Sequence, residues 1–243
     1  MQTLGTSWGN AAYSQRSGSD EGPTLVFLHG TGCDSIDWRG LQRHLPSTIS
    51  TVSFDFRGHG ESSVPDEDFD FSDLTSDIHL LLEILAVNKP LIVGHSLGGM
   101  VGIELSTMRS LAGLVLVEGW TRLVHARAAY QTGPRFGSLT AEQIQEVERK
   151  RDATMARFTG DQWRAFWHSV TAYDGSTALD TIECPVFELY GTDHARPDTR
   201  ERLGVPERSN IHFEWIEDCG HYTHYEQPES IADICSRAHQ MCQ

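Results

Sequence analysis

Ser96 lies at the centre of the pentapeptide Gly94-His95-Ser96-Leu97-Gly98, a spacing that indicates a nucleophilic serine. The pentapeptide follows an apolar run, 90–93, and precedes a segment able to form a helix. A G-x-S-x-G at such a junction makes a sharp, strained turn in which the flanking glycines allow close backbone approach. The turn aims the hydroxyl at a helix N-terminus, where unpaired N–H groups and the helix dipole favour negative charge. These residues predict acyl-transfer chemistry.

The elements that must hold this turn alternate along the chain. Apolar or β-branched runs predict strands at 24–28, 51–56, 91–94, 113–117, 186–190 and 212–216. Apolar residues three and four positions apart predict helices at 74–85, 99–108 and 229–241. Continuous apolar strands that alternate with helices predict an α/β fold, with a mostly parallel sheet covered by helices on both faces. Ligands bind beyond the carboxyl ends of the strands in such sheets.

Residues 121–183 interrupt the alternation, because they contain helical patterns and no strand candidate. Thr140 begins a capping-box pattern, which predicts a helix to about 158, and a second helix is predicted at 161–172. We therefore expect a single domain, residues 1–243, with its core at 1–120 and 184–243 and a helical cap insertion at about 121–183. The cap is rich in aromatic residues, which either pack its interior, the interpretation we favour, or form an apolar roof over the substrate: Trp163, Phe166, Trp167 and Tyr173.

The composition limits the partners. Acidic residues outnumber Lys and Arg by 34 to 19, and the formal charge of −15 argues against a nucleic-acid or anionic-membrane partner. Five cysteines without a C-x-x-C spacing indicate neither a disulfide framework nor a zinc site. No signal-peptide pattern and no run of about 18 apolar residues is present. We expect a cytoplasmic protein that acts on a small-molecule substrate without a metal or an organic cofactor; the sequence does not indicate an oligomeric state.

Over most of its length the chain resembles the α/β-hydrolase superfamily. Four segments in the family's order carry the resemblance: His29–Gly32 after the first predicted strand, 55–62 after the second, the Ser96 pentapeptide, and Gly220-His221 after the last strand. The run 226–229 opens the final helix, as in many family members. The resemblance implies the α/β-hydrolase fold, with a serine, a histidine and an acid acting together.

His221 is the base that the resemblance selects for Ser96, whose hydroxyl is a poor nucleophile until a base takes its proton. Its position suits this role independently, because the loop 217–220 after the strand 212–216 ends in a glycine that can bring the imidazole to the carboxyl edge of the sheet. His95 lies inside the turn and is expected to face away from the substrate.

The acid that orients the histidine has two candidates. The commonest family site follows the penultimate strand in a G-x-x-D pattern, but here Asp193 follows Gly191 one residue too early. Glu118 ends the apolar run 113–117, which resembles the arrangement in some haloalkane dehalogenases and their relatives. A carboxylate at this point is costly unless it is paired. We favour Glu118, with Asp193 as the alternative.

The oxyanion of the tetrahedral intermediate needs N–H donors. One is expected from Leu97, the residue after the nucleophile, and the resemblance implies that Thr31 supplies the second. We expect the substrate pocket to be lined by residues of the core and the cap: Gly30, Trp38, Trp120 and Trp167. For Trp38, packing within its own loop is an equal alternative.

The function that these residues predict is that of a serine esterase: cleavage of a carboxylic ester, a thioester or a lactone of a small, fairly hydrophobic substrate through an acyl-enzyme. Because a fold does not fix a function, the alternatives are cofactor-free perhydrolysis, hydrolysis of a carbon–carbon or amide bond, and a hydrolase-like ligand receptor. Dehalogenases and epoxide hydrolases are disfavoured because their nucleophile is an aspartate, whereas this turn carries Ser96.

Overall fold

A mixed β-sheet forms the centre of the molecule, for which a computed structural model describes residues 1–129, 135–192 and 200–243. Within these ranges the strands are β1 (Gln2–Thr6), β2 (Gly9–Arg16), β3 (Leu25–Leu28), β4 (Thr51–Phe54), β5 (Leu91–His95), β6 (Gly113–Val117), β7 (Val186–Gly191) and β8 (Ile211–Ile216). Their spatial order is β1-β2-β4-β3-β5-β6-β7-β8. The strands from β4 to β8 are parallel, and the β1–β2 hairpin joins β4 in antiparallel orientation.

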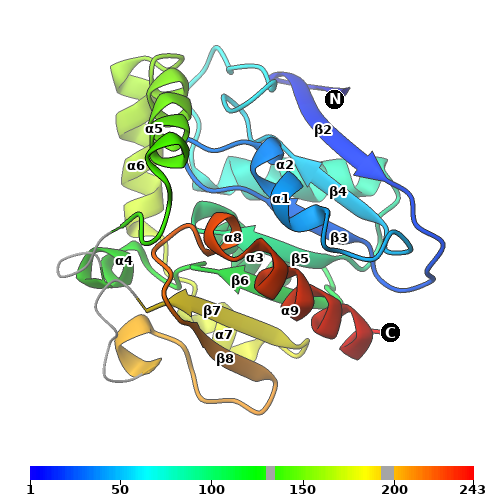
Figure 1. Cartoon of the computed structure of the whole chain (residues 1–243). Coiled ribbons are helices and arrows are strands. Elements are labelled where there is room, and N and C mark those ends of the chain that lie inside the picture. Colours follow the sequence, from blue (N-terminus) through cyan, green and yellow to red (C-terminus); the bar gives the residue numbers. More distant parts are fainter. Residues whose placement is uncertain (130–134, 193–199) are drawn as a thin grey trace.

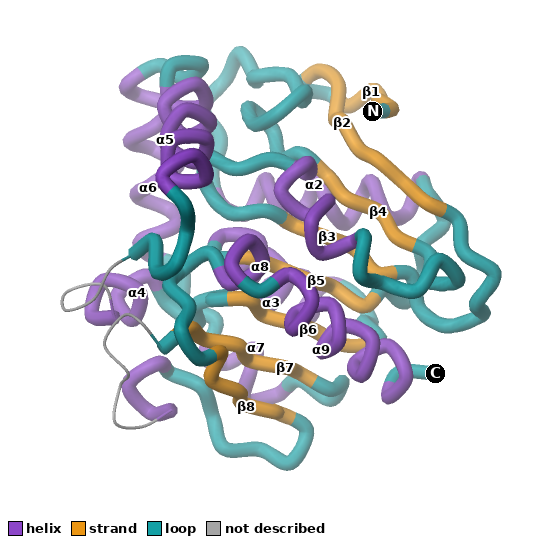
Figure 2. The backbone as a smooth tube through the Cα atoms, in the orientation of Figure 1, coloured by secondary structure: helices purple, strands orange, loops and turns teal. Residues whose placement is uncertain are grey.

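Helices cover both faces of the sheet (Figure 2), and this explains why β3, β5 and β6 are apolar at nearly every position. One face packs against α2 (Phe71–Ile84), α3 (Leu97–Met108) and α7 (Ser176–Thr181). The other face packs against α1 (Arg39–Gln42) and α9 (Pro228–Met241). The predicted α/β class, a mostly parallel sheet with helices on both sides, is confirmed.

Three helices between β6 and β7 gather at one end of the sheet, away from both termini (Figure 1). They are α4 (Leu123–Ala129), α5 (Ala141–Met155) and α6 (Gly160–Ala172). Capping boxes begin α5 and α6: the hydroxyl of Thr140 accepts from Gln143 N–H, and that of Thr159 accepts from Gln162 N–H. No strand occurs at 121–129 or 135–183.

Several elements differ from the sequence prediction. The hairpin β1–β2 was not predicted, because its small and polar residues form no apolar run. Helix α2 begins three residues early, at Phe71, because the Asp70 side chain accepts from the Ser72 and Asp73 N–H groups. Six short helical segments among the described residues lie outside the predicted helices, because periodicity needs more residues: η1 (Ser35–Trp38), α1, α4, α7, η2 (Arg200–Leu203) and α8 (Thr223–Glu226). Among the described helices, none is long and apolar enough to cross a membrane.

Candidate active site

Ser96 occupies a strained turn between β5 and α3, with φ at 51° and ψ at −115°. A non-glycine residue in such a region costs about 1–3 kcal/mol, and such strain clusters at functional sites. The flanking glycines are required sterically. A Cβ on Gly94 would lie 2.4 Å from the carbonyl oxygen of Gly98, and one on Gly98 would lie 2.1 Å from that of Leu28. The strand-to-helix junction predicted for the pentapeptide is therefore present.

His221 and Glu118 meet behind this turn, although 103 residues separate them in sequence. The His221 Nδ1 atom lies 3.4 Å from Glu118 Oε2, and the two residues are 4% and 0% exposed. Catalytic hydrogen bonds are often long in enzymes without substrate. The other oxygen, Glu118 Oε1, accepts from the Gly191 N–H at 2.6 Å. The carboxylate of Glu118 is thus oriented to hold the imidazole. The alternative acid, Asp193, lies outside the described residues.

A cavity of about 450 Å³ opens beside Ser96 and His221. Both predicted oxyanion residues, Thr31 and Leu97, line it. Leu97 is the first residue of α3, and the first N–H groups of a helix have no partner inside the helix. The remaining described lining residues come from the Ser96 turn, from α3 to α6 and from the loops before α4, α5 and α8: His95, Met100, Trp120, Leu123, Ala126, Arg135, Arg151, Met155, Trp163, Trp167, Val170 and Tyr222.

Comparison with known proteins decides the family. The model described as "Alpha/beta hydrolase family" matches residues 25–234. The chain belongs to the alpha/beta hydrolase family. An uncharacterized protein of Mycobacterium tuberculosis is 34% identical over 83 residues, 34% of this chain and only 24% of that protein. The putative carbamate hydrolase RutD of Shigella flexneri is 30% identical over 199 residues, 71% of this chain and 74% of RutD.

Solved structures with low sequence identity share the fold of this alpha/beta hydrolase. The N-acyl homoserine lactonase AidH, complexed with N-butanoyl homoserine, superposes with a TM-score of 0.78 at 18% identity, covering 100% of this chain and 97% of AidH. The enol-lactonase from Burkholderia xenovorans LB400 gives a TM-score of 0.75 at 17% identity, with 98% and 99% coverage.

Of the four residues that were expected to line the pocket of this hydrolase, two do so. Trp120 and Trp167 line the cavity. Gly30 lies against the nucleophile without being a lining residue, since a Cβ there would be 3.2 Å from Ser96 Cβ. The expectation that Trp38 lines the pocket is wrong. Its side chain is fully buried in the core cluster that packs against α1 and α9, and its ring lies 4.7 Å from the His224 ring and 5.2 Å from the Phe27 ring, measured between centroids.

The cap aromatics also separate into two groups. Trp163 and Trp167 line the cavity and form part of its roof. Phe166 is 1% exposed and packs against Phe69, and Tyr173 packs against Phe71 with 4.3 Å between ring centroids. Both interpretations of the cap aromatics therefore apply, each to two of the four residues.

The expectation that His95 faces away from the substrate is wrong. It lines the cavity, and its ring lies 4.6 Å from the His221 ring and 4.4 Å from the His224 ring, measured between centroids. Burial, followed by the neighbouring His224, holds the pKa of His95 well below its usual value. Burial also lowers the pKa of His224 to about 3. Both rings are therefore neutral near pH 7, and His95 contributes hydrogen bonding to the site without adding charge.

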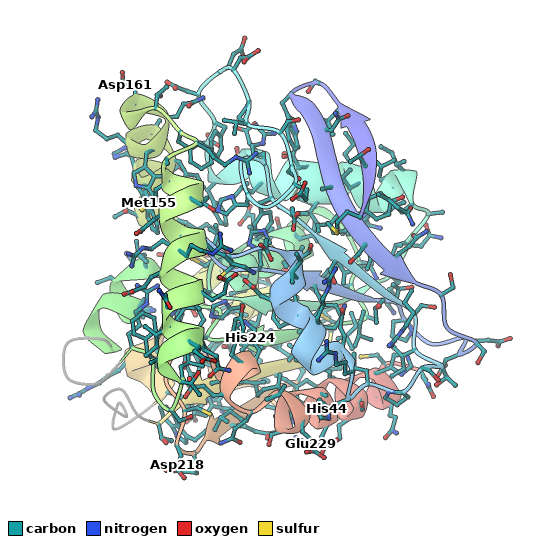
Figure 3. The ribbon with its side chains drawn as sticks, turned by 45° about the horizontal axis from the view of Figure 1, so that its top comes forward. His44, Met155, Asp161, Asp218, His224 and Glu229 are labelled. Atoms are coloured by element: carbon teal, nitrogen blue, oxygen red, sulfur yellow. The ribbon has the colours of Figure 1, made fainter. Side chains whose placement is uncertain are left out.

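An ion-pair cluster that the sequence did not indicate ties α5 to the loop after β3. Lys150 on α5 donates to Asp34 Oδ1 at 2.9 Å and also to Asp37, which accepts from the Tyr225 hydroxyl as well. Figure 3 shows α5 beside α8, the helix on which His224 is labelled. The labels of Met155, at the end of α5, and Asp161, near the start of α6, mark where these two helices connect. Because Asp34 lies only three residues after Thr31, the cluster holds the helical cap against the loop that carries Thr31.

Proposed function

We propose that this alpha/beta hydrolase is a serine esterase that cleaves a carboxylic ester, a thioester or a lactone through an acyl-enzyme. The observation that carries the proposal is the common location of Ser96 and His221 at one cavity, with Glu118 against the far nitrogen of the imidazole. A nucleophile beside a base, with the base oriented by a third group, is the signature of nucleophilic catalysis.

In the proposed first half-reaction, Ser96 Oγ attacks the carbonyl carbon of the substrate while His221 Nε2 takes the hydroxyl proton. The tetrahedral oxyanion accepts hydrogen bonds from the Thr31 and Leu97 N–H groups, each worth about 2.7–4 kcal/mol at such a site. His221 then gives the proton to the leaving oxygen or sulfur, and the carbon–heteroatom bond breaks. Glu118 fixes the tautomer of the imidazole and stabilises the imidazolium throughout.

In the second half-reaction a water molecule loses a proton to His221 and attacks the acyl-enzyme. The second tetrahedral intermediate uses the same two N–H donors, and its collapse returns the proton to Ser96 and releases the carboxylic acid. Each step is assigned to a side chain or a backbone amide of this chain, so the proposed reaction requires no cofactor.

The apolar part of the cavity supports a fairly hydrophobic acyl group. Met100 from α3, Trp163 and Val170 from α6 and Leu123 from α4 surround the space in front of Ser96. Burying an aliphatic chain among such side chains contributes about 0.8 kcal/mol per methylene group. We therefore expect kcat/KM to rise with acyl chain length until the chain fills the cavity.

A second candidate function is carbamate hydrolysis. It is favoured by the match to RutD, a putative carbamate hydrolase, over 71% of this chain. The same residues would serve, because a carbamate carbonyl passes through the same kind of tetrahedral intermediate. The two functions differ in the substrate that the cavity prefers.

The test combines labelling with a substrate panel. A fluorophosphonate probe is expected to label the wild type and not Ser96→Ala, whereas the control Ser19→Ala, at an exposed loop serine, is labelled normally. p-Nitrophenyl esters of increasing chain length, lactones and an aryl carbamate are then compared by kcat/KM. Full esterase activity in Ser96→Ala would overturn the mechanism, and a preference for the carbamate would select the second candidate.

The nucleophile and base are expected to act as a unit. His221→Ala lowers kcat about as far as Ser96→Ala, and the double variant is no slower than either single one, because losses within such a unit do not add. Additive losses, with each replacement slowing a variant that already lacks the other group, would argue against a shared step.

A further inference from the structure

The charged side chains described as lining the cavity are positive, whereas the chain as a whole is strongly negative. The chain carries 34 acidic residues and a formal charge of −15. Even so, two arginines, Arg135 and Arg151, stand among the residues described as lining the cavity, and no aspartate or glutamate does. Arg135 is exposed and the side chain of Arg151 is 37% exposed, so both guanidinium groups reach solvent and can attract an anionic ligand to the cavity.

The guanidinium of Arg135 is held in position by aromatic groups. Its Nη2 donates to the Tyr222 hydroxyl at 3.1 Å, and its central carbon lies 5.7 Å from the Tyr222 ring centroid and 5.8 Å from that of Phe136. No carboxylate among the described residues pairs with it. Contacts of this kind orient a guanidinium without neutralising it, which leaves the planar fork of donors available to an anion.

Arg151 on α5 lines the same cavity. A Cβ on Gly32 would lie 2.9 Å from both Arg151 Cα and Cβ, so the stem of this arginine packs directly beside the Thr31 loop. Its guanidinium bonds to Asp152, whose side chain is 68% exposed. An exposed pair of adjacent residues contributes little free energy. A ligand carboxylate can therefore displace it at small cost.

We propose that the substrate carries a carboxylate, which Arg135 and Arg151 bind. Guanidinium groups bind carboxylates through paired, charge-assisted hydrogen bonds. This proposal rests on the proposed function and makes it more specific: Ser96 and Thr31 hold the reacting carbonyl, the cap and α3 hold the acyl chain, and the arginines hold the acid.

The position of Arg135 assigns the carboxylate to the leaving group. The main-chain carbonyl of Arg135 accepts from the His221 N–H at 2.9 Å, so this arginine is attached to the loop of the general base. The leaving group takes its proton from His221, and it must therefore depart on that side. The substrate class is an ester whose alcohol portion bears a carboxylate and whose acyl portion is hydrophobic.

A binding experiment tests the proposal without requiring turnover. Isothermal titration calorimetry compares 4-(butanoylamino)benzoate with 4-(butanoylamino)benzamide, amides of similar shape that differ in charge. The wild type is expected to bind the benzoate at least tenfold more tightly. Arg135→Gln and Arg151→Gln should each lose most of this preference. Arg149→Gln is the matched control, since Arg149 also lies on α5 but pairs with Glu146 and does not line the cavity.

Equal affinity of the wild type for the two compounds, no binding of either at millimolar concentration, or a preference that survives in Arg135→Gln would each overturn the proposal. Hydrolysis of the corresponding esters, 4-(butanoyloxy)benzoate and 4-(butanoyloxy)benzamide, separates this failure from failure of the proposed function. Ser96→Ala is expected to bind the benzoate amide with the wild-type preference and to hydrolyse neither ester. Turnover by Ser96→Ala would overturn the mechanism but leave the carboxylate site standing. Turnover that depends on Ser96, together with equal binding of the benzoate and the benzamide, would overturn the carboxylate site but leave the mechanism standing.

Discussion

His95 donates a hydrogen bond from Nε2 to the backbone carbonyl of His221 across 3.0 Å. A carbonyl oxygen only accepts, so Nε2 carries the ring proton in the neutral imidazole. The bond joins the turn that presents Ser96 to the loop that presents His221, and its two residues are 126 positions apart in sequence. His95 is thus placed to position the base relative to the nucleophile without touching the substrate carbonyl.

Replacing His95 by phenylalanine removes its hydrogen bond to the backbone of His221. We expect kcat to fall by about tenfold with little change in KM, since a lost hydrogen bond costs on the order of 1 kcal/mol and affects the reacting geometry. His95→Gln, whose amide can donate to the same carbonyl, is expected to recover part of the activity. Steady-state kinetics with a p-nitrophenyl ester measures both. A drop confined to KM would contradict a positioning role.

Glu118→Gln tests the orienting acid. The change keeps the shape but removes the charge that fixes the His221 tautomer, so kcat is expected to fall by roughly 10⁴-fold with a nearly unchanged free energy of unfolding. Asp193→Asn is the matched comparison and should be much milder. The reverse order of effects would assign the acid to Asp193. If both single replacements are tolerated and only the double variant fails, the two carboxylates share the role.

Lys150→Met tests the connection between the cap and the Thr31 loop. The side chain of Asp37 is 2% exposed and pairs with Lys150, so removal of the ammonium leaves a buried charge uncompensated. We expect the unfolding free energy to fall by about 2–4 kcal/mol and Tm to fall by roughly 5–10 °C, with an increased KM. Lys89→Met is the control, because Lys89 is exposed and is the only other lysine in the chain. Thermal unfolding followed by circular dichroism should show no comparable loss there. Equal Tm values for the two variants would exclude the proposed connection.

Glu188 gives the stability of the fold a dependence on pH. This residue lies inside β7 with no exposed surface, and burial raises its pKa from 4.5 to about 8. Between these values the folded chain retains a proton that the unfolded chain has released, so stability falls as pH rises from about 4.5 to 8. Glu188→Gln should remove this slope and stabilise the fold at pH 8 by about 1–3 kcal/mol. Urea unfolding at pH 5, 6.5 and 8 measures it, with the exposed Glu229→Gln as control. A wild-type slope retained in Glu188→Gln would refute the assignment.

Local patterns in the sequence were sufficient for the architecture around the nucleophile. The apolar runs of β5 and β6 and the glycines beside Ser96 predict a strand, a sharp turn and a helix, because each depends on the backbone sterics and side-chain periodicity of a few adjacent residues. The same holds for the capping box at Thr140, which predicted the start of α5. The hairpin β1–β2 escaped prediction because pairing with β4, and not an apolar run of its own, stabilises it.

Contacts between distant residues were decided only in the tertiary structure. A family resemblance and the cost of an unpaired carboxylate favoured Glu118 as the partner of His221, but their 3.4 Å separation depends on the order of β6, β7 and β8 in the sheet. The same long-range packing turned Trp38 away from the cavity, turned His95 toward it and brought Arg135 and Arg151 to its lining. Periodicity reports which face of an element is apolar, whereas the neighbours across a cavity are selected by how separate elements pack together, and no local pattern in the sequence records this.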